Sequence, residues 1–233
     1  MALKFYFDLM SQPSRAVYMF LKLNSIPFEA KPVALRKGEH HAEDFAKINP
    51  FKLVPVIDDN GFVLTESVAI MKYLAVKYNV ADHWYPRSDL QLQARVDEYM
   101  NWQHFNTRLN AAMLFQNLFI IPQATGKPIS WGKVENFRKG CSKVIHDLEK
   151  YYLKSQPFLC GADISMADLL GVCEWMQLYG VHEDRLFMAS PLVSAWMDRV
   201  KSKTQPVFDE AHKFTYRVRE VYKPQTEPPE AKL

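Results

Sequence analysis

Residues 3–15 of the chain read LKFYFDLMSQPSR and contain two successive patterns. Apolar residues occupy every second position of the first five, and a period of two indicates a β-strand. Ser11 then suits the N-cap of a helix, and Pro13 suits a first helical turn because no intrahelical N–H is lost there. Apolar residues follow at helical spacing, which predicts a helix to about Asn24.

The next seventy residues extend this start into a small α/β unit. A second strand is predicted at residues 28–35, and it belongs at a sheet edge because Pro32 cannot donate to a ladder. Strand, helix and strand in this order normally give a parallel pair with a right-handed crossover. The remaining predicted elements are a short helix at 43–48, a hairpin of 54–57 and 62–64 around Asn60-Gly61, and a long helix from Ser67.

Residues 78–88, YNVADHWYPRS, interrupt this pattern with a proline and polar side chains. The rest of the chain shows helical periodicity, including a helix start where Ser165 and Asp168 have the spacing of a capping box. We therefore predict an α/β plus all-α fold. The predicted parts are a first domain at 1–80, a linker at 81–88, an all-helical domain at 89–222 and a mobile tail at 223–233. Long helices are expected at 90–119 and 131–153, with further helices near 191–201 and 206–216.

The composition excludes several classes of protein. Apolar residues make up 48% of the 233 residues, which is ordinary for a globular chain with a core. A net charge of +3 is too balanced to indicate an obligate nucleic-acid partner. No apolar run is long enough to span a bilayer, and the N-terminus lacks the pattern of a secretory signal. Three widely spaced cysteines suggest neither disulfides nor a metal site, so we expect a reduced, cytoplasmic protein without a metal.

Several short motifs occur in an order that resembles one known family. They are Asp8-Leu9-Met10-Ser11-Gln12-Pro13-Ser14-Arg15, Lys37-Gly38-Glu39-His40, Asn49-Pro50-Phe51, Val54-Pro55, Leu64-Thr65-Glu66-Ser67, Asp82-His83-Trp84-Tyr85-Pro86 and Ser165-x-x-Asp168. Together with the order of elements, they resemble the cytosolic glutathione S-transferases, and the serine of the first motif resembles the theta class. The resemblance covers residues 1–215 approximately. It implies a thioredoxin-like first domain, glutathione as co-substrate, an electrophilic small molecule bound by the helical domain, and a homodimer.

The role of Ser11 can be interpreted in two ways. From the residues alone it is most simply an N-cap, which stabilises a helix by roughly 1 kcal/mol. The resemblance implies instead that its hydroxyl donates a hydrogen bond to the glutathione sulfur. A thiol with a pKa near 8.5 is only a few per cent ionised at neutral pH, so such a bond would raise the amount of the attacking thiolate. Ser11 is then a stabiliser of the nucleophile and not the nucleophile itself.

The resemblance also assigns the contacts that hold glutathione. His40 and His41 would face the glycyl end, although a solvated basic loop is an equal alternative. A cis bond before Pro55 would present the Val54 backbone to the cysteinyl unit. Glu66 and Ser67, which could also be a capping pair, would bind the γ-glutamyl end at a helix N-terminus. Many theta members carry lysine where this chain has Leu53, so a cationic contact is lost here or is supplied by Lys52.

The long helix offers two neighbouring stripes. We expect Trp102, Phe105, Leu109 and Ala112 to face the core. His104, Arg108, Ala111 and Phe115 form the other stripe, which is either an ordinary half-exposed face or the wall of the electrophile site. The resemblance implies that Arg108 faces the sulfur, so Arg108 is the second catalytic candidate. Phe105 departs from relatives that place a polar residue against the partner subunit.

The predicted function is thiolate attack on electrophilic carbon, with conjugation and detoxification as the outcome and reduction of hydroperoxides as a further reaction to consider. The alternative is a non-catalytic ligand-binding or structural protein on the same scaffold. A glutaredoxin-like role fits poorly because no cysteine occupies the first strand–helix junction. A serine hydrolase would need a G-x-S-x-G elbow, which the sequence lacks.

Overall fold

The computed structural model describes residues 2–225. Its sheet has four strands in the order β2-β1-β3-β4. Strand β1 pairs in parallel with β2 and antiparallel with β3, and β3 pairs antiparallel with β4. The strands are β1 (Leu3–Phe7), β2 (Phe28–Pro32), β3 (Val56–Asp59) and β4 (Phe62–Leu64). The predicted edge position of the second strand is confirmed, as is the mixed α/β character of this unit.

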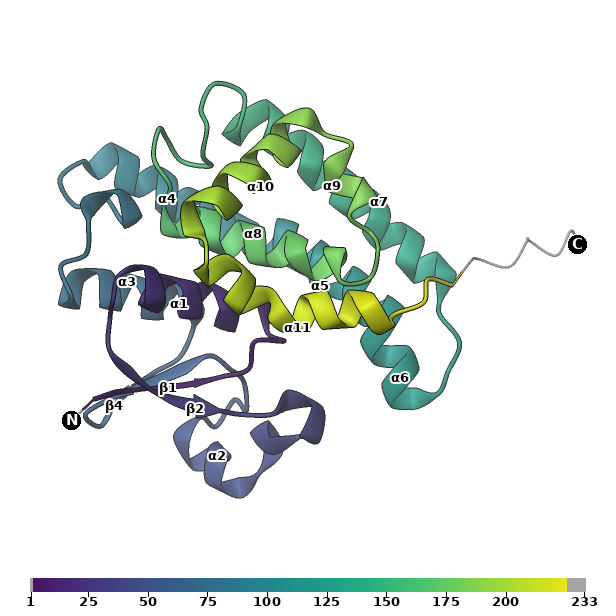
Figure 1. Cartoon of the computed structure of the whole chain (residues 1–233), viewed down its shortest axis with the longest axis horizontal. Coiled ribbons are helices and arrows are strands. Elements are labelled where there is room, and N and C mark those ends of the chain that lie inside the picture. The colour runs from purple at the N-terminus through teal and green to yellow at the C-terminus, as the bar shows by residue number, and fades with distance from the viewer. Residues whose placement is uncertain (1, 226–233) are drawn as a thin grey trace, which may run out of the picture.

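Helices cover both faces of this sheet. Helices α1 (Gln12–Leu23) and α3 (Ser67–Lys77) lie on the face toward the rest of the molecule, and α2 (Glu43–Ile48) lies on the opposite face (Figure 1). Short 3₁₀ turns at Leu35–Lys37, Glu39–His41 and Asp82–Trp84 connect the elements. The second strand ends at Pro32, earlier than the predicted end at Leu35, where the first of these turns begins.

All regular elements from Leu90 to Val221 are helical. They are α4 (Leu90–Gln103), α5 (Leu109–Phe115), α6 (Ile121–Thr125), α7 (Trp131–Asp147), α8 (Met166–Tyr179), α9 (Arg185–Met188), α10 (Pro191–Thr204) and α11 (Val207–Val221). Every residue of α8 from Met166 to Leu178 is buried, and the other helices surround it (Figure 1). The predicted capping box is present at its start, where the Asp168 carboxylate accepts from the Ser165 N–H at 2.8 Å.

The long helix predicted after residue 90 is interrupted by π-helical turns. The segments His104–Arg108 and Gln116–Ile120 separate α4, α5 and α6. The prediction that Phe105 and Leu109 face the core is wrong: they are 80% and 44% exposed, whereas Ala111 and Phe115 of the other stripe are buried. The buried face is already set in α4 by Gln103, and Phe105 lies about 200° around the helix from it.

The sheet unit and the helical part share one continuous apolar core. Helix α1 packs against α8 and α11, and residues of the predicted linker join this core. Trp84 and Tyr85 are buried, Trp84 contacts Phe20 edge-to-face at 5.8 Å, and His83 Nδ1 lies 2.6 Å from the Ile164 carbonyl oxygen. The domain limits at 80 and 88 remain predictions. Most of the predicted mobile tail, residues 226–233, lies outside the described residues.

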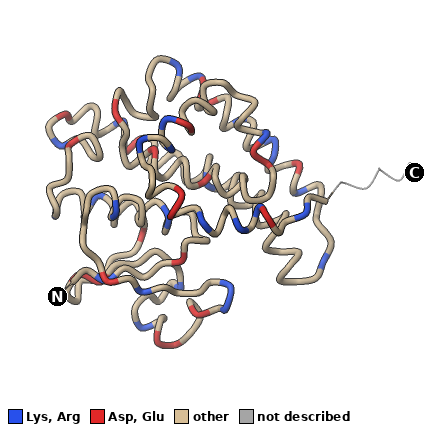
Figure 2. The backbone as a smooth tube through the Cα atoms, viewed as in Figure 1, with Lys and Arg blue, Asp and Glu red and all other residues tan. Residues whose placement is uncertain are grey.

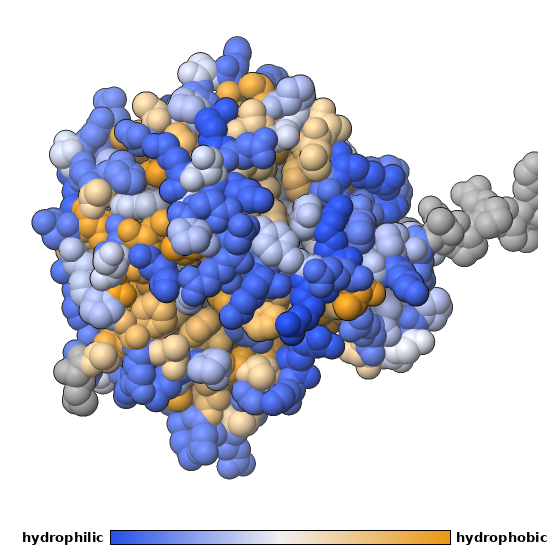
Figure 3. All heavy atoms as spheres, viewed as in Figure 1, coloured by the Kyte–Doolittle hydropathy of each residue, from blue (hydrophilic) through white to orange (hydrophobic). Residues whose placement is uncertain are grey.

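Charged residues of both signs alternate over the backbone, without a large region of one sign in the view of Figure 2. On the face shown in Figure 3, hydrophobic residues lie in separate groups among hydrophilic ones. Between residues 2 and 225, no helix is both long and apolar enough to cross a membrane.

Candidate active site

A cleft lies where the loop before β3, the start of α3 and the long helix meet. Its lining residues are Pro13, Asn49, Phe51, Leu53, Val54, Pro55, Thr65, Glu66, Ser67 and Arg108. Five of the eight predicted site residues are therefore brought together, from positions that span more than fifty residues of sequence. Ser11 lies two residues before the lining Pro13, and the two histidines lie on the loop at Glu39–His41.

Ser11 is the N-cap of α1, so the cap reading is confirmed. Its Oγ accepts a long hydrogen bond from the Ser14 N–H at 3.4 Å, and the side chain is buried. A hydroxyl that accepts in this way keeps its own proton for another acceptor. The cap and the predicted bond to a sulfur are therefore compatible, because they use different parts of the same hydroxyl.

The turn that holds Ser11 is fixed by Asp8 at the end of β1. One oxygen of this carboxylate accepts from the Met10 N–H at 2.8 Å, and the other accepts from the Leu35 N–H at 2.9 Å. The Ser11 N–H donates to the Asp8 carbonyl at 2.9 Å. The position of the Ser11 hydroxyl thus depends on a carboxylate that also ties down the loop after β2.

Arg15, the last residue of the first motif, has a structural role. Its guanidinium is fully buried between α1 and α8. Nη1 donates to the carbonyls of Leu9 and Met10 at 3.0 and 3.3 Å, directly before Ser11. Nη2 donates to the Cys173 carbonyl and to Gln177 Oε1, both at 2.7 Å. The only sequence signal for this structural role was the occurrence of a charged residue among the apolar positions of α1.

The lower wall of the cleft is the loop from Asn49 to Pro55. The bond between Val54 and Pro55 is cis, as the resemblance implied. Asn49 is buried and shapes the loop, since its Nδ2 donates to the Leu53 carbonyl at 2.8 Å and its Oδ1 accepts from the Phe51 N–H at 3.0 Å. Leu53 itself is 61% exposed at the cleft. Lys52 has a left-handed backbone with φ of 56° and is exposed.

Glu66 precedes α3 with an unusual backbone. Its φ of 66° lies in a region that non-glycine residues rarely adopt, and such residues concentrate at functional sites. Ser67, which is buried, is the first residue of the helix. The N–H groups of a first helical turn have no intrahelical partner, so the start of α3 offers donors at the cleft. These donors suit an anionic group such as a carboxylate.

The two predicted histidines are adjacent and close to each other. The ring centroids of His40 and His41 are 3.8 Å apart. Burial and then the neighbouring His41 charge lower the pKa of His40. His40 Nδ1 is buried without a hydrogen-bond partner among the described residues. Neither ring belongs to the cleft lining, so their predicted contact with a glycyl end remains a prediction.

Arg108 is the cleft residue that the helical part contributes. It lies on the π-helical segment His104–Arg108, and its side chain is 33% exposed. Its Nη1 lies 3.7 Å from Glu174 Oε1 of α8. His104, one turn earlier, has a lowered pKa because of its burial and then because of the Arg108 charge, with Glu66 acting in the opposite direction. Arg108 of the helical part therefore lines the same cleft as Glu66 and the N-terminus of α3, which belong to the sheet unit.

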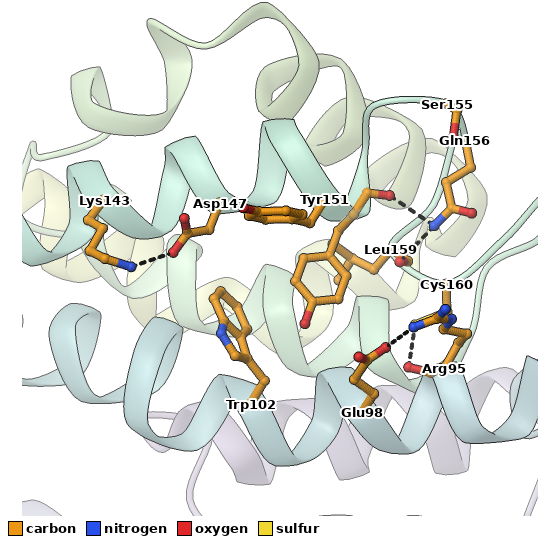
Figure 4. A pocket seen from close by; sticks show the side chains of 11 residues that line it. Arg95, Glu98, Trp102, Lys143, Asp147, Tyr151, Ser155, Gln156, Leu159 and Cys160 are labelled. Atoms are coloured by element: carbon orange, nitrogen blue, oxygen red, sulfur yellow. Dashed lines mark hydrogen bonds and ion pairs between the residues drawn. The ribbon is translucent and has the colours of Figure 1, made fainter.

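A larger cavity of about 670 Å³ lies elsewhere, between α4 and the end of α7 (Figure 4). Trp102 and Tyr152 line it, together with the ion pairs Lys143–Asp147 and Arg95–Glu98, each at 2.7 Å. None of the predicted site residues lines this cavity. Because its charged groups already pair with each other, we place the candidate site at the smaller cleft. Within residues 2–225, no three His, Cys, Asp or Glu side chains gather as metal ligands would.

Both units of the chain are similar to known proteins. The family description "Glutathione S-transferase, N-terminal domain" matches residues 1–76, and "Glutathione S-transferase, C-terminal domain" matches residues 133–203. Glutathione S-transferase theta-1 of Bos taurus is 42% identical over 221 residues, which cover 94% of this chain and 91% of that protein.

Two solved human structures are also similar. Human glutathione-S-transferase T1-1 in its apo form aligns with a TM-score of 0.89 and 40% identity, covering 94% of this chain and 92% of that one. Human glutathione transferase theta-2, solved in complex with glutathione and an unknown ligand, aligns with a TM-score of 0.89 and 37% identity, covering 94% and 89% of the two chains. The chain therefore belongs to the glutathione S-transferase family, and within that family to the theta class.

Proposed function

We propose that this glutathione S-transferase binds glutathione in the cleft and directs its thiolate at an electrophilic small molecule held by the helical part. One observation carries the proposal. The cleft brings the cis Val54-Pro55 turn and the free end of α3 together with an arginine of the other unit. A tripeptide with two carboxylates and an ammonium group needs backbone pairing, helix-terminal donors and an anion, and these are what the cleft offers.

Each end of the tripeptide has a proposed partner. The Val54 backbone pairs with the cysteinyl unit in the manner of a short added strand. Ser67 and the first N–H groups of α3 bind the γ-glutamyl carboxylate, and Glu66 binds its ammonium group. Leu53 and its neighbour Lys52 flank the site, and His40 and His41 face the glycyl end. The contact at Leu53 is apolar, so Lys52 is the cation available on this loop.

Ser11 stabilises the thiolate. A hydrogen bond donated by its hydroxyl, together with the N-terminus of α1, would lower the pKa of the thiol by about one to two units, worth roughly 1.4–2.7 kcal/mol. The thiolate then becomes a major species near neutral pH. It attacks carbon and displaces a leaving group or adds to an activated double bond.

Arg108 acts at the other side of the sulfur. A guanidinium stabilises negative charge that develops on a leaving group, and fixed donors are most effective where water is scarce. The second reading, a non-catalytic protein on the same scaffold, has no specific observation in its favour. Conjugation of foreign electrophiles, and so detoxification, follows as the role, with hydroperoxide reduction as an additional reaction of the same thiolate.

We further propose a cytoplasmic homodimer that needs no metal. Three free, buried cysteines suit a reducing compartment. Exposed apolar side chains on β4 and beside α5 suit coverage by a second copy; they are Phe62, Val63, Phe105 and Leu109. The domain limits of 1–80, 81–88 and 89–222 belong to the same proposal. Sedimentation at micromolar concentration tests the dimer, and particles of 27 kDa alone would reject it.

The function is tested by titrating the thiolate absorbance of bound glutathione. We expect the absorbance to appear at a lower pH than for free glutathione, and the Ser11→Ala variant to return it toward the free value. Conjugation of an aryl halide is measured in the same samples. Glutathione that binds without a shift in titration, and without conjugation, would favour the non-catalytic alternative.

A further inference from the structure

Glu174 is a buried carboxylate that the proposed reaction does not use. It lies on α8 and its side chain is 1% exposed. Oε1 lies 3.7 Å from Arg108 Nη1, and Oε2 is buried without a hydrogen-bond partner among the described residues. A buried, incompletely paired carboxylate destabilises a fold, so its presence beside the cleft requires a reason.

Two cations surround this carboxylate. Burial raises the pKa of Glu174, while the charge of Arg108 and then that of Arg15 lower it. Arg15 already donates to four acceptors, two of them on α8. Among the described residues, Arg108 forms no hydrogen bond of this kind, and it lines the cleft from a π-helical turn. Of these two cations, Arg108 is therefore the one that pairs with Glu174.

We propose that Glu174 is a positioning residue for Arg108: it holds one edge of the guanidinium so that the other edge faces the sulfur and the electrophile. This inference rests on the proposed role of Arg108. An arginine side chain has large rotamer freedom, and an anchored guanidinium loses less of it when it meets a developing anion. The guanidinium carries five N–H donors, so an anchor at one edge leaves donors free at the other.

Helix α8 gives this anchor a fixed reference. Cys173, directly before Glu174, accepts through its carbonyl from Arg15, and Arg15 also holds the carbonyls of Leu9 and Met10 before Ser11. The turn of Ser11 and the guanidinium of Arg108 are thus both tied to one buried helix. Helix α8, to which neither residue belongs, therefore fixes the distance between the Ser11 turn and the Arg108 guanidinium.

The test compares two substrates that differ in their leaving group. We measure the turnover of a halide- or sulfate-releasing substrate divided by that of an enone. Glu174→Gln should lower this ratio on the order of tenfold, because a displaced catalytic group loses rate steeply with distance. The KM for glutathione should stay within about twofold, since the tripeptide contacts are unchanged. Glu174→Asp keeps the charge but withdraws it by one methylene, and should give an intermediate ratio.

Glu183→Gln is the matched control. Glu183 is also a buried acid paired with an arginine, with its Oε1 2.5 Å from Arg138 Nη2, but Arg138, unlike Arg108, does not line the cleft. It should leave the ratio unchanged while it lowers stability. Equal falls in ratio for the two variants would overturn the proposal, because the effect would then be general.

The Arg108→Ala background separates this inference from the proposed function. There, Glu174→Gln should cause no further fall in the ratio, since the group that it positions is gone. A further fall would overturn the positioning role. If Arg108→Ala lowers the ratio but Glu174→Gln and Glu174→Asp do not, the inference fails and the role of Arg108 stands. An unchanged ratio in Arg108→Ala itself would overturn both.

Discussion

The region around Arg15 and the region around Arg108 use the same residue type against the same helix in opposite ways. Arg15 is fully buried, and its four hydrogen bonds all end on protein oxygen atoms. Arg108 is one-third exposed, and its ion pair with Glu174 spans 3.7 Å. Both Nη atoms of the first guanidinium are occupied by the fold, and only its buried Nε lacks a partner among the described residues. The second guanidinium retains donors that can meet a ligand.

This difference shows that two properties distinguish a structural arginine from a functional one. They are the burial of the guanidinium and the number of protein acceptors that it meets. A buried guanidinium is tolerated only where its charge and its donors are compensated. When the protein supplies the acceptors, their hydrogen bonds also fix the loops that carry them, as Arg15 does for the turn before Ser11. Incomplete compensation at a cleft leaves a cation that can respond to the charge of a substrate, and the predictions below test this division.

The largest expected effect is on stability at the junction of α1 and α8. Arg15→Met should lower the free energy of unfolding by about 3 kcal/mol or more, because several buried carbonyls lose their donor. Urea unfolding measures this. Arg95→Met, at an exposed ion pair with Glu98, is the control and should change stability by less than about 1 kcal/mol. Similar losses for the two variants would contradict the structural role of Arg15.

The next effect separates activity from stability at the cleft. Arg108→Ala should lower the free energy of unfolding less than Arg15→Met does, because Glu174 loses its paired cation but no buried carbonyl loses a donor. It should also raise the activation free energy for substrates with anionic leaving groups by up to about 3 kcal/mol. Neutral additions should be affected least. Turnover ratios and unfolding are measured on the same preparation. A loss of stability as large as that of Arg15→Met would abolish the contrast between the two arginines.

Ser11 lies between the two regions, since Arg15 holds its turn and the cleft opens beside it. Ser11→Ala should lower turnover by up to about 25-fold at neutral pH, which is the fall in the thiolate fraction when the thiol pKa rises by as much as two units toward 8.5. Glutathione affinity should change little, because the lost bond acts on the sulfur and not on the ends of the tripeptide. Turnover and thiolate absorbance close to those of the wild type would leave Ser11 as a helix cap only.

The Arg15 region should also respond to acid through His212 of α11. Burial, and then the charge of Arg15, lower the pKa of this imidazole well below its usual value. In acid the unfolded chain therefore binds a proton that the folded chain does not, and stability falls as the pH drops below about 6.5. At pH 5.5 the loss reaches about 1.3 kcal/mol relative to pH 7. His212→Gln should remove this part of the pH dependence of urea unfolding, and an identical slope in both proteins would contradict it.

The smallest effect is expected at the lower wall of the cleft. Leu53→Lys should tighten glutathione binding by about 0.2–1 kcal/mol, which is the value of an exposed ion pair. Calorimetry measures this change, with Leu53→Met as the neutral control. An unchanged affinity would indicate that Lys52 already supplies the cation, or that no cation acts at this wall.

Most of the fold could be predicted because its signals are local. Period-two alternation, the Asn60-Gly61 hairpin and the caps at Ser11 and Ser165 each depend on residues a few positions apart. The long helix shows where such reasoning fails. Phe105 and Leu109 were expected in the core at a 3.6-residue spacing, but the helix buries the face of Gln103, Thr107 and Ala111 instead. Periodicity alone does not decide which of two neighbouring stripes packs inward.

The candidate site was likewise predicted only in part. The motifs and their resemblance located Leu53, Val54, Glu66, Ser67 and Arg108, which line one cleft. Asn49 belongs to the motif Asn49-Pro50-Phe51, but its role in shaping the loop was not predicted, because that role rests on hydrogen bonds that only the folded loop forms. The positions of His40 and His41 relative to a bound tripeptide remain predictions.

The sequence by itself determined the strands, the helix starts and the family to which the chain belongs. Only the tertiary structure decided which arginine is occupied by the fold and which is left for a ligand. The acceptors of Arg15 on α8 lie 158 and 162 residues away in the sequence, and Glu174 meets Arg108 across two packed helices. Periodicity and capping are settled within a few residues of chain, whereas burial and charge compensation depend on contacts that exist only after the two units pack together.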